Sequence, residues 1–317
     1  MSRITNSLLP LLPAGLAAAL VLLPGVRLRA GDAGGPNPVE ARVEGLLRQM
    51  TLEEKLGQLQ QLDGAADGRI KPEQLALAAK GLLGSTLNVR GAANVNEIQR
   101  AAVDSSRLKI PILAGYDVIH GYRTIFPIPL GEAASFDPAL AETTARIAAA
   151  EATAVGLKWT FAPMVDIARD PRWGRIAEGA GEDPYLGSAF ARARVRGFQG
   201  EGGGDPQRVI ACAKHWVGYG AAEAGREYNT TDLSERALRE VYFPPFRAAL
   251  EAGVGTFMSA FNDLDGLPAT ANPFTLTRVL RGEWGFDGFV VSDYTAVPEL
   301  IQHGVARDEP EAAQKAL

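Results

Sequence analysis

The feature that most constrains this chain is a regular alternation of strand-like and helix-like segments from residue 39 onward. Short apolar runs bounded by turn residues are typical of buried strands, and six occur: 82–89, 110–114, 157–161, 209–213, 255–259 and 289–292. Helical patterns lie between them, including 138–156, 184–200 and 234–253, the last interrupted by Pro244 and Pro245. This alternation predicts parallel strands linked by helices, arranged either as an open doubly wound sheet or as a (β/α)₈ barrel.

The loops favour the barrel. Helix-to-strand connections are as short as Gly156 to Leu157, whereas several strand-to-helix connections are long and rich in Asp, Arg, Trp, Tyr and His. Barrel enzymes carry their catalytic groups on the loops that follow the strands, and the opposite loops are plain. We therefore predict an α/β fold of the TIM-type (β/α)₈ class. It is expected to be incomplete at the C-terminus, because about six βα units do not close an eight-stranded barrel.

The N-terminal region predicts export. Residues 1–33 have the pattern of a signal peptide, with Arg3 ahead of an apolar run from Leu8 to Leu23 and small residues Gly31 and Ala33 beside a cleavage site. The run is too short and too broken by prolines to be a good membrane span. Residues 34–38 form a linker and 39–317 the barrel domain. A periplasmic or secreted location follows from this pattern.

Composition excludes several classes of function. A net charge of −5 without long charge runs argues against nucleic acid and membranes as partners. The single cysteine, Cys212, excludes an intramolecular disulfide and a cysteine-based metal site, and it is predicted to be a buried structural thiol. Three histidines in no metal-binding pattern argue against zinc, and no glycine-rich phosphate loop follows a strand. No metal or cofactor is therefore expected.

Polar side chains follow the strand-like runs at the points where they end. Asp117 follows the second run, Arg175 lies in the loop after the third, and Lys214 and His215 follow the fourth. Asp293 follows the sixth. Because the carboxyl ends of parallel strands meet at one end of a barrel, we expect these groups to converge there. Each has a structural alternative: Asp293, for instance, would cap a helix over 295–303.

Apolar residues accompany this polar set. Met258 and Phe261 follow the fifth run, and Trp173 and Trp216 are either aromatic walls of the site or plain core. Carboxylates and cations bond the vicinal hydroxyls of a sugar, aromatic faces pack against its CH surface, and a carboxylate beside Arg and Lys stays ionised as a nucleophile. The pattern indicates a glycosidase-like site.

Seven segments carry a resemblance to a known family: 50–55 (MTLEEK), 116–121 (YDVIHG), 169–175 (RDPRWGR), 181–185 (GEDPY), 214–215 (KH), 228–230 (YNT) and 291–293 (VSD). Together they make the chain similar to the N-terminal barrel domain of the glycoside hydrolase family 3 β-glucosidases, especially the bacterial periplasmic type. The resemblance implies a retaining, exo-acting enzyme that removes terminal β-D-glucosyl residues from β-glucosides or β-linked gluco-oligosaccharides. It implies that Asp293 is the nucleophile. It also implies that the substrate is bound or enclosed by Asp117, Arg175, Lys214, His215, Met258 and Phe261.

One departure from the family pattern concerns the general acid. The family's single-domain N-acetylhexosaminidases carry Lys-His-Phe-Pro-Gly-His-Gly and then an Asp-x-His that supplies the proton, but here Val217 and Tyr219 replace that Pro and that second His. The resemblance to the two-domain glucosidases therefore places the acid on a following C-terminal α/β sandwich domain, which residues 1–317 lack. The isolated chain is expected to be inactive on natural substrates.

Three other functions remain open on the sequence. A related β-xylosidase is one, although Asp117 favours a glucosidase because the family's xylosidases tend to carry Glu in that segment. A Schiff-base aldolase would use Lys214, with Arg175 and His215 near enough to lower its pKa. A non-catalytic sugar-binding barrel is the third, and it fits the absence of the acid.

Overall fold

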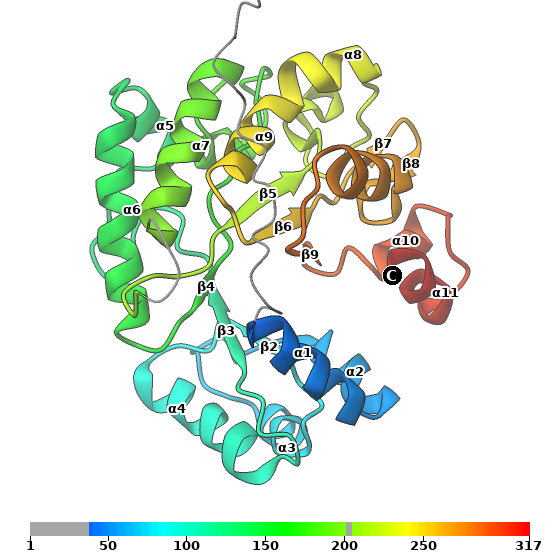
Figure 1. Ribbon diagram of the computed structural model, residues 1–317. Helices are drawn as coiled ribbons and strands as arrows, with labels where there is room; N and C mark the ends of the chain where they lie inside the picture. Colours follow the sequence, from blue (N-terminus) through cyan, green and yellow to red (C-terminus); the bar gives the residue numbers. More distant parts are fainter. Residues whose placement is uncertain (1–37, 201–204) are drawn as a thin grey trace, which may run out of the picture. The chain divides into compact units, whose positions relative to one another are not determined.

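The computed structural model describes residues 38–200 and 205–317 (Figure 1). The chain divides into two units, Met1–Arg48 and Gln49–Leu317. Helix α1 (Pro38–Gln49) begins the described part, and none of its residues is buried. The predicted signal peptide and residues 34–37 of the predicted linker lie outside the described residues, while Pro38 is the first residue of α1. Among the helices of the described ranges, none combines the length and apolar character that a bilayer crossing demands.

Seven parallel strands lie at the centre of the second unit. One sheet has the order β1 (Gln61–Asp63), β2 (Ser85–Leu87), β3 (Leu113–Tyr116), β4 (Trp159–Thr160), and another has the order β5 (Cys212–Trp216), β6 (Thr256–Ser259), β9 (Phe289–Ser292). Parallel bridges from Trp159 to Ile210 and from Met164 to Lys214 continue this order from β4 to β5. The predicted barrel fold is confirmed, with seven of its strands among the described residues.

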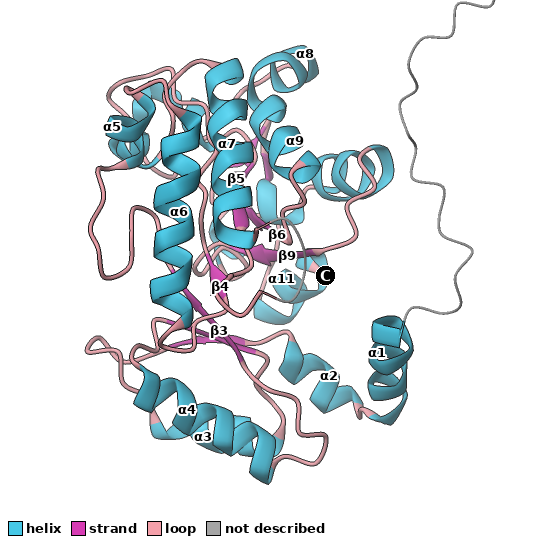
Figure 2. Ribbon diagram, turned by 60° about the vertical axis from the view of Figure 1, so that its left-hand side comes forward, coloured by secondary structure: helices cyan, strands magenta, loops and turns pink. Residues whose placement is uncertain are grey.

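Helices surround these strands (Figures 1 and 2). The α-helices of the second unit are α2 (Leu52–Gln58), α3 (Pro72–Lys80), α4 (Ala92–Arg100), α5 (Pro129–Ala133), α6 (Pro138–Thr153), α7 (Pro184–Gln199), α8 (Glu235–Ala237), α9 (Phe243–Glu251), α10 (Glu299–Gln302) and α11 (Glu309–Ala316). Three π-helical segments are η1 (Ala101–Ser105), η5 (Leu238–Tyr242) and η7 (Phe274–Glu283). Short 3₁₀ turns are η2 (Gly174–Glu178), η3 (Tyr219–Ala221), η4 (Glu223–Gly225) and η6 (Ala269–Ala271), and β7 (Asp263–Leu264) and β8 (Leu267–Pro268) form a hairpin.

Local sequence signals set several helix starts. Thr51 and Glu54 form a capping box at the start of α2: the Thr51 hydroxyl accepts the Glu54 N–H at 3.2 Å, and Glu54 Oε2 accepts the Thr51 N–H at 2.8 Å. Asp137 caps α6, because its Oδ1 accepts the N–H groups of Ala139 and Leu140. These bonds satisfy backbone donors that a helix leaves free in its first turn.

Side chains at alternate strand positions fill the barrel interior. Trp159, Phe161, Cys212 and Met258 form one buried cluster there. Gly115 faces the same space, and a Cβ on it would lie 2.7 Å from the Phe161 ring, so a larger residue would displace that ring. Cys212 is free and buried, as predicted, and burial raises the pKa of its thiol to about 12.

The structure corrects the sequence interpretation at three points. Strand β1 adds a seventh parallel strand to the six predicted, because three residues, two of them polar, do not stand out as an apolar run. Strand β9, predicted to be fully buried, is only partly buried, and Phe289 is 43% exposed. Within the described residues β9 pairs with β6 alone and therefore has an open edge. The helix predicted over 295–303 is reduced to α10, which begins at Glu299.

Candidate active site

Asp293 lies directly after β9, at the carboxyl end of the strand. Its Oδ1 accepts the Tyr294 N–H at 2.7 Å, so the side chain does not cap α10, which begins six residues later. Burial raises the pKa of this carboxyl to about 6. The Tyr294 N–H and the charges of Lys214 and Arg175 oppose this rise, and the charge of Asp117 adds to it. Lys214 and Arg175 therefore favour the ionised carboxylate, as expected, but burial outweighs them and keeps the pKa of Asp293 above its ordinary value.

His215, on β5, is fully buried and lies between two carboxylates. Asp166 Oδ2 accepts the backbone N–H of His215 at 2.9 Å and lies 2.8 Å from its ring Nδ1. The other ring nitrogen, Nε2, lies 3.4 Å from Asp293 Oδ2. Burial lowers the pKa of His215 well below its usual value, and the charges of Arg175 and Lys214 lower it further. The imidazole is therefore neutral at pH 7.

The hydrogen bonds of Asp166 decide the tautomer of this ring. Because Asp166 Oδ2 already accepts one N–H from His215, we assign the ring proton to Nδ1, which donates to the same oxygen. Burial raises the pKa of Asp166 to about 7, although the His215 N–H opposes the rise. The Nε2 atom of His215 is then an acceptor that faces a second acceptor, Asp293 Oδ2.

Neither of these two facing atoms has a hydrogen-bond donor within the described ranges. A buried polar atom without a partner costs about 1–3 kcal/mol, so native proteins keep few of them. Both His215 Nε2 and Asp293 Oδ2 could accept a hydrogen bond from a hydroxyl group. The end of the barrel above Asp293 and His215 is thus suited chemically to a ligand that carries hydroxyl groups.

Lys214 and Asp117 form an ion pair beside this site. Lys214 Nζ lies 2.8 Å from Asp117 Oδ1, and the two side chains are 4% and 44% exposed respectively. The lysine is thus enclosed by the barrel, whereas the carboxylate reaches solvent. An exposed carboxylate fixed by a buried cation keeps acceptor positions free for a ligand.

Arg175, on η2, is held by carboxylates. Its Nε donates to Glu178 Oε1 at 2.6 Å, and its Nη2 donates to Glu178 Oε2 at 2.9 Å. Its Nη1 lies 3.9 Å from Glu227 Oε1. Burial lowers the pKa of Arg175, but the hydrogen bonds and charge of Glu178 outweigh burial and leave it above the usual value. Glu227 also accepts hydrogen bonds from the Tyr219 hydroxyl and from Trp173 Nε1. These contacts fix the guanidinium plane, and the charge of Asp293 also raises the pKa of Arg175.

The apolar residues divide between the site and the core. Phe261 packs against Tyr219 and Tyr228, with ring centroids 5.8 and 4.5 Å apart. Met258 lies in the interior cluster of the barrel. Trp216 is fully buried in an aromatic cluster of the core, so its predicted alternative role as a wall of the site is wrong.

Trp173 is also almost completely buried, at 1% exposed, which leaves no face for a sugar. The sequence left both tryptophans open between the site and the core, and the structure places both in the core. Sequence reasoning missed Glu227 as a partner of Arg175 and did not connect Asp166 with His215. The one available signal was the position of Asp166 after the third predicted strand.

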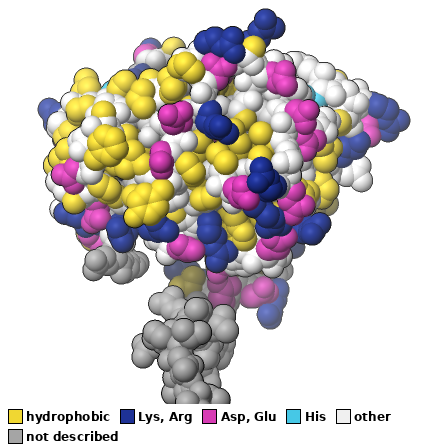
Figure 3. Space-filling model, turned by 90° about the horizontal axis from the view of Figure 1, so that it is seen from above, with side chains coloured by type: hydrophobic (Ala, Val, Ile, Leu, Met, Phe, Trp, Pro, Cys, Tyr) yellow, Lys and Arg dark blue, Asp and Glu magenta, His cyan; other side chains and the backbone are white. Residues whose placement is uncertain are grey.

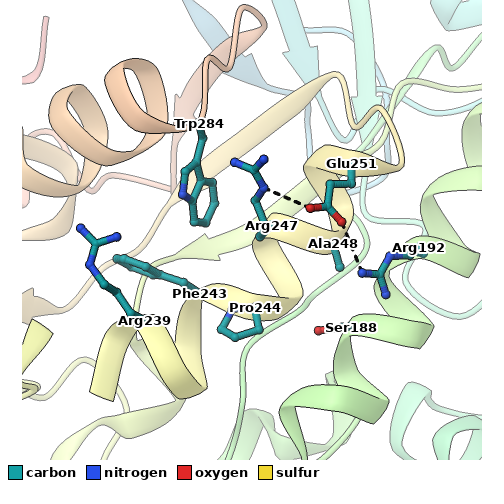
Figure 4. A pocket seen from close by; sticks show the side chains of 9 residues that line it. All are labelled: Ser188, Arg192, Arg239, Phe243, Pro244, Arg247, Ala248, Glu251 and Trp284. Atoms are coloured by element: carbon teal, nitrogen blue, oxygen red, sulfur yellow. Dashed lines mark hydrogen bonds and ion pairs between the residues drawn. The ribbon is translucent and has the colours of Figure 1, made fainter. Parts of the chain in front are cut away.

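A separate hollow of about 430 Å³ lies on the outer helices, among η5, α7 and α9 (Figure 4). Three of its charged groups pair with one another, because Glu251 lies 3.2 Å from Arg247 and 3.3 Å from Arg192. The fourth, Arg239, pairs with Glu235 and Glu283. The Arg247 guanidinium also lies over the Trp284 ring. On the face seen in Figure 3, acidic and basic side chains are interspersed rather than gathered by sign. Within the described ranges, no group of three His, Cys, Asp or Glu side chains could hold a metal ion.

Known proteins resemble this chain in sequence and in structure. A periplasmic β-glucosidase of Salmonella typhimurium is 43% identical over 305 residues, which are 96% of this chain and 40% of that protein. A β-xylosidase of Formosa agariphila is 40% identical over 69% of this chain and 32% of its own length. The β-glucosidase from Listeria innocua, solved in complex with isofagomine and with glucose, superposes with a TM-score of 0.82 at 44% identity. That match covers 87% of this chain and 40% of the other.

The chain thus spans about 40% of the length of the β-glucosidases of Salmonella and Listeria. The family model described as the glycosyl hydrolase family 3 N-terminal domain matches residues 51–317. That match includes every strand of the barrel and every residue of the site described above. The chain belongs to glycosyl hydrolase family 3, and its barrel is the N-terminal domain of that family.

Proposed function

We propose that this barrel is the nucleophile-bearing domain of a retaining, exo-acting β-glucosidase. The observation that carries the proposal is the convergence of Asp293, His215, Lys214 and Asp117 at the carboxyl ends of three strands. The β-glucosidases of Salmonella typhimurium and Listeria innocua, at 43% and 44% identity, support the same interpretation. The substrate is a β-glucoside or a β-linked gluco-oligosaccharide.

In this proposal Asp293 attacks the anomeric carbon and forms a glycosyl ester, which water then hydrolyses with net retention of configuration. Its pKa of about 6 leaves it ionised at neutral pH. Asp117, Lys214 and Arg175 bind hydroxyls of the terminal glucosyl unit. His215 Nε2, as an acceptor, takes a hydrogen bond from another of these hydroxyls, and Met258 and Phe261 enclose the sugar.

The general acid is proposed to come from a downstream domain. No carboxyl group near Asp293 in the described residues is suited to it: Asp166 and Asp117 are bonded to His215 and Lys214, and both oxygens of Glu227 already accept hydrogen bonds. The two-fifths coverage of the matched β-glucosidases leaves room for such a domain in those proteins. Export, inferred from residues 1–33, accords with the periplasmic relative from Salmonella.

Labelling the nucleophile tests the proposal. A 2-deoxy-2-fluoro-β-glucoside with a 2,4-dinitrophenolate leaving group needs little proton donation, so it should glycosylate Asp293 and persist on it. Peptide mass spectrometry of the full-length gene product should place the label on the peptide that contains Asp293, and the Asp293→Ala variant should stay unlabelled. Reproducible label on Asp117 or Asp166 would overturn the assignment.

The alternatives make different predictions. The β-xylosidase alternative has the Formosa relative in its favour, and it predicts a higher kcat/KM for aryl β-xylosides than for aryl β-glucosides. The aldolase alternative needs a free amine at Lys214, but an ammonium paired with Asp117 has no lone pair for attack on a carbonyl. A non-catalytic sugar-binding barrel predicts sugar binding without a covalent adduct.

A further inference from the structure

Asp166 is a buried carboxylate that takes no direct part in the proposed reaction. It is 3% exposed and lies in the loop after β4, where the chain runs beside β5. The Val165 N–H donates to the Lys214 carbonyl at 2.8 Å, and the Lys214 N–H donates to the Pro163 carbonyl at 3.2 Å. These backbone hydrogen bonds hold the carboxylate of Asp166 next to His215.

A single oxygen of Asp166 holds both N–H groups of His215. Asp166 Oδ2 accepts the backbone N–H at 2.9 Å and lies 2.8 Å from the ring Nδ1. A backbone N–H can only donate, so this oxygen is the acceptor for both groups and the ring proton stays on Nδ1. The ring is also held in place, because it is completely buried and the Tyr219 ring packs edge-on against it with the centroids 5.3 Å apart.

The place of this proton decides what the nucleophile meets. His215 Nε2 lies 3.4 Å from Asp293 Oδ2, and among the described residues neither atom has a hydrogen-bond partner. The other oxygen of Asp293, Oδ1, accepts the Tyr294 N–H. If the ring proton were on Nε2 instead, the ring would be a donor beside Oδ2. A donated hydrogen bond stabilises the ionised carboxylate and so makes it a weaker nucleophile.

Several strands and loops bring titratable or charged groups to Asp293: Asp117, Arg175, Lys214, His215 and Tyr228. Lys214 and Arg175 are cations that already pair with carboxylates, Lys214 with Asp117. Burial raises the pKa of Tyr228, so its hydroxyl is neutral at pH 7. Only in His215, of these five groups, does a proton that moves between two ring nitrogens turn an acceptor beside Asp293 into a donor.

We propose that Asp166 is a positioning residue for the nucleophile: it holds the proton of His215 on Nδ1 and so keeps the ring from donating a hydrogen bond to Asp293 Oδ2. The inference rests on the proposed function, which makes Asp293 the nucleophile. An Oδ2 without this hydrogen bond keeps its full reactivity, and Nε2 keeps its lone pair for a hydroxyl group of the substrate. Asp166 acts through His215 and does not itself contact the reacting atoms.

The position of the ring proton can be measured directly in the free enzyme. In the full-length gene product labelled with ¹⁵N at histidine, NMR distinguishes a ring nitrogen that carries a proton from one that does not, and the signals of His215 are those that disappear in His215→Gln. Burial raises the pKa of Asp166 to about 7, so the spectrum is recorded at about pH 8, where Asp166 is ionised. Nδ1 should be protonated and Nε2 unprotonated. The reverse assignment would overturn the inference.

Two variants of Asp166 link this proton to the nucleophile, with the rate at which the 2-deoxy-2-fluoro-β-glucoside labels Asp293 as the readout. Asp166→Leu has a similar size but no acceptor, so the ring proton should move to Nε2. Labelling should then slow by about 10- to 100-fold, the range for a hydrogen bond to a charged group. Asp166→Asn should keep its oxygen towards His215, because its N–H₂ group would meet the backbone donor there. It should keep the wild-type tautomer and a labelling rate within about fivefold.

Asp170→Asn is the matched control, because Asp170 lies in the same loop, is partly exposed and pairs with Arg172. It should change neither the tautomer nor the labelling rate. A folded Asp166→Leu that keeps its proton on Nδ1 or labels at the wild-type rate would overturn the inference alone, as would an Asp166→Asn as slow as Asp166→Leu. If Asp166→Leu does not fold, the wild-type spectrum and Asp166→Asn still decide. A wild-type enzyme that is neither labelled nor active on any β-glycoside would overturn the proposed function and this inference with it.

Discussion

Replacing Asp293 by Asn should stabilise the folded protein at neutral pH while abolishing turnover. The folded-state pKa of about 6 lies above 3.8, the ordinary pKa of an aspartate, which Asp293 retains in the unfolded chain. A difference of about two pKa units corresponds to about 3 kcal/mol. At pH 7 the free energy of unfolding is lower by about this amount, because Asp293 is ionised while it is buried. The side chain is 11% exposed, so solvent screening reduces this only modestly, and we expect a gain of about 2–3 kcal/mol.

The pH dependence gives the sign of this effect. Below about pH 3 Asp293 is protonated in both states, so it does not change the stability. As the pH rises towards 6, the unfolded chain ionises first and the wild type loses stability, whereas Asn does not titrate. The stability difference between Asp293→Asn and wild type should therefore grow between pH 4.5 and 7.5 and then level off. The Asn side-chain N–H₂ also offers a donor to His215 Nε2, which lies 3.4 Å from Asp293 Oδ2.

Urea unfolding of the full-length gene product, followed by tryptophan fluorescence at four pH values, measures this difference. Asp170→Asn is the matched control, because hydrogen bonds from Arg172 lower the pKa of Asp170 to about 2. There the ionised form is the stabilising one, so that variant should gain nothing at pH 7.5. A stability difference for Asp293→Asn that is zero or negative at pH 7.5, or independent of pH, would refute the reasoning.

Four further outcomes are expected. Below about pH 6, kcat/KM should fall because Asp293 becomes protonated, and well below pH 6 it should fall tenfold for each pH unit. A kcat/KM that stays constant from pH 7 down to pH 5 would contradict this. Asp117→Ala should lower kcat as well as raise KM, by roughly 2–4 kcal/mol in kcat/KM, and a change of less than about threefold would remove its hydroxyl-binding role. The folded 317-residue chain should hydrolyse 2,4-dinitrophenyl β-glucoside slowly, because that leaving group needs no proton, and it should not hydrolyse cellobiose. Cellobiose turnover that is lost in Asp293→Ala would place the general acid within the chain. Glu132→Gln should destabilise the barrel by about 3–5 kcal/mol, because it leaves Arg194 buried without its 2.8 Å partner, whereas Glu251→Gln on the surface should cost about 1 kcal/mol or less in the same urea assay.

The sequence alone determined the features that depend on neighbouring residues. The capping box at Thr51 and the cap at Asp137 satisfy backbone donors within three residues, so their type and spacing predict them. The alternation of strand-like and helix-like segments is also a pattern of neighbouring residues, and it predicted the barrel. Because all carboxyl ends of parallel strands meet at one end of a barrel, the sequence predicted that Lys214, which lies on β5, and Asp293, which follows β9, are at the same end.

Only the tertiary structure decided the contacts between distant parts of the chain. Asp166 and His215 are 49 residues apart, Arg175 and Glu227 are 52 apart, and no local pattern joins either pair. The direction of the pKa shift of Asp293 likewise depends on how much burial outweighs Lys214 and Arg175, and burial exists only once the barrel has formed.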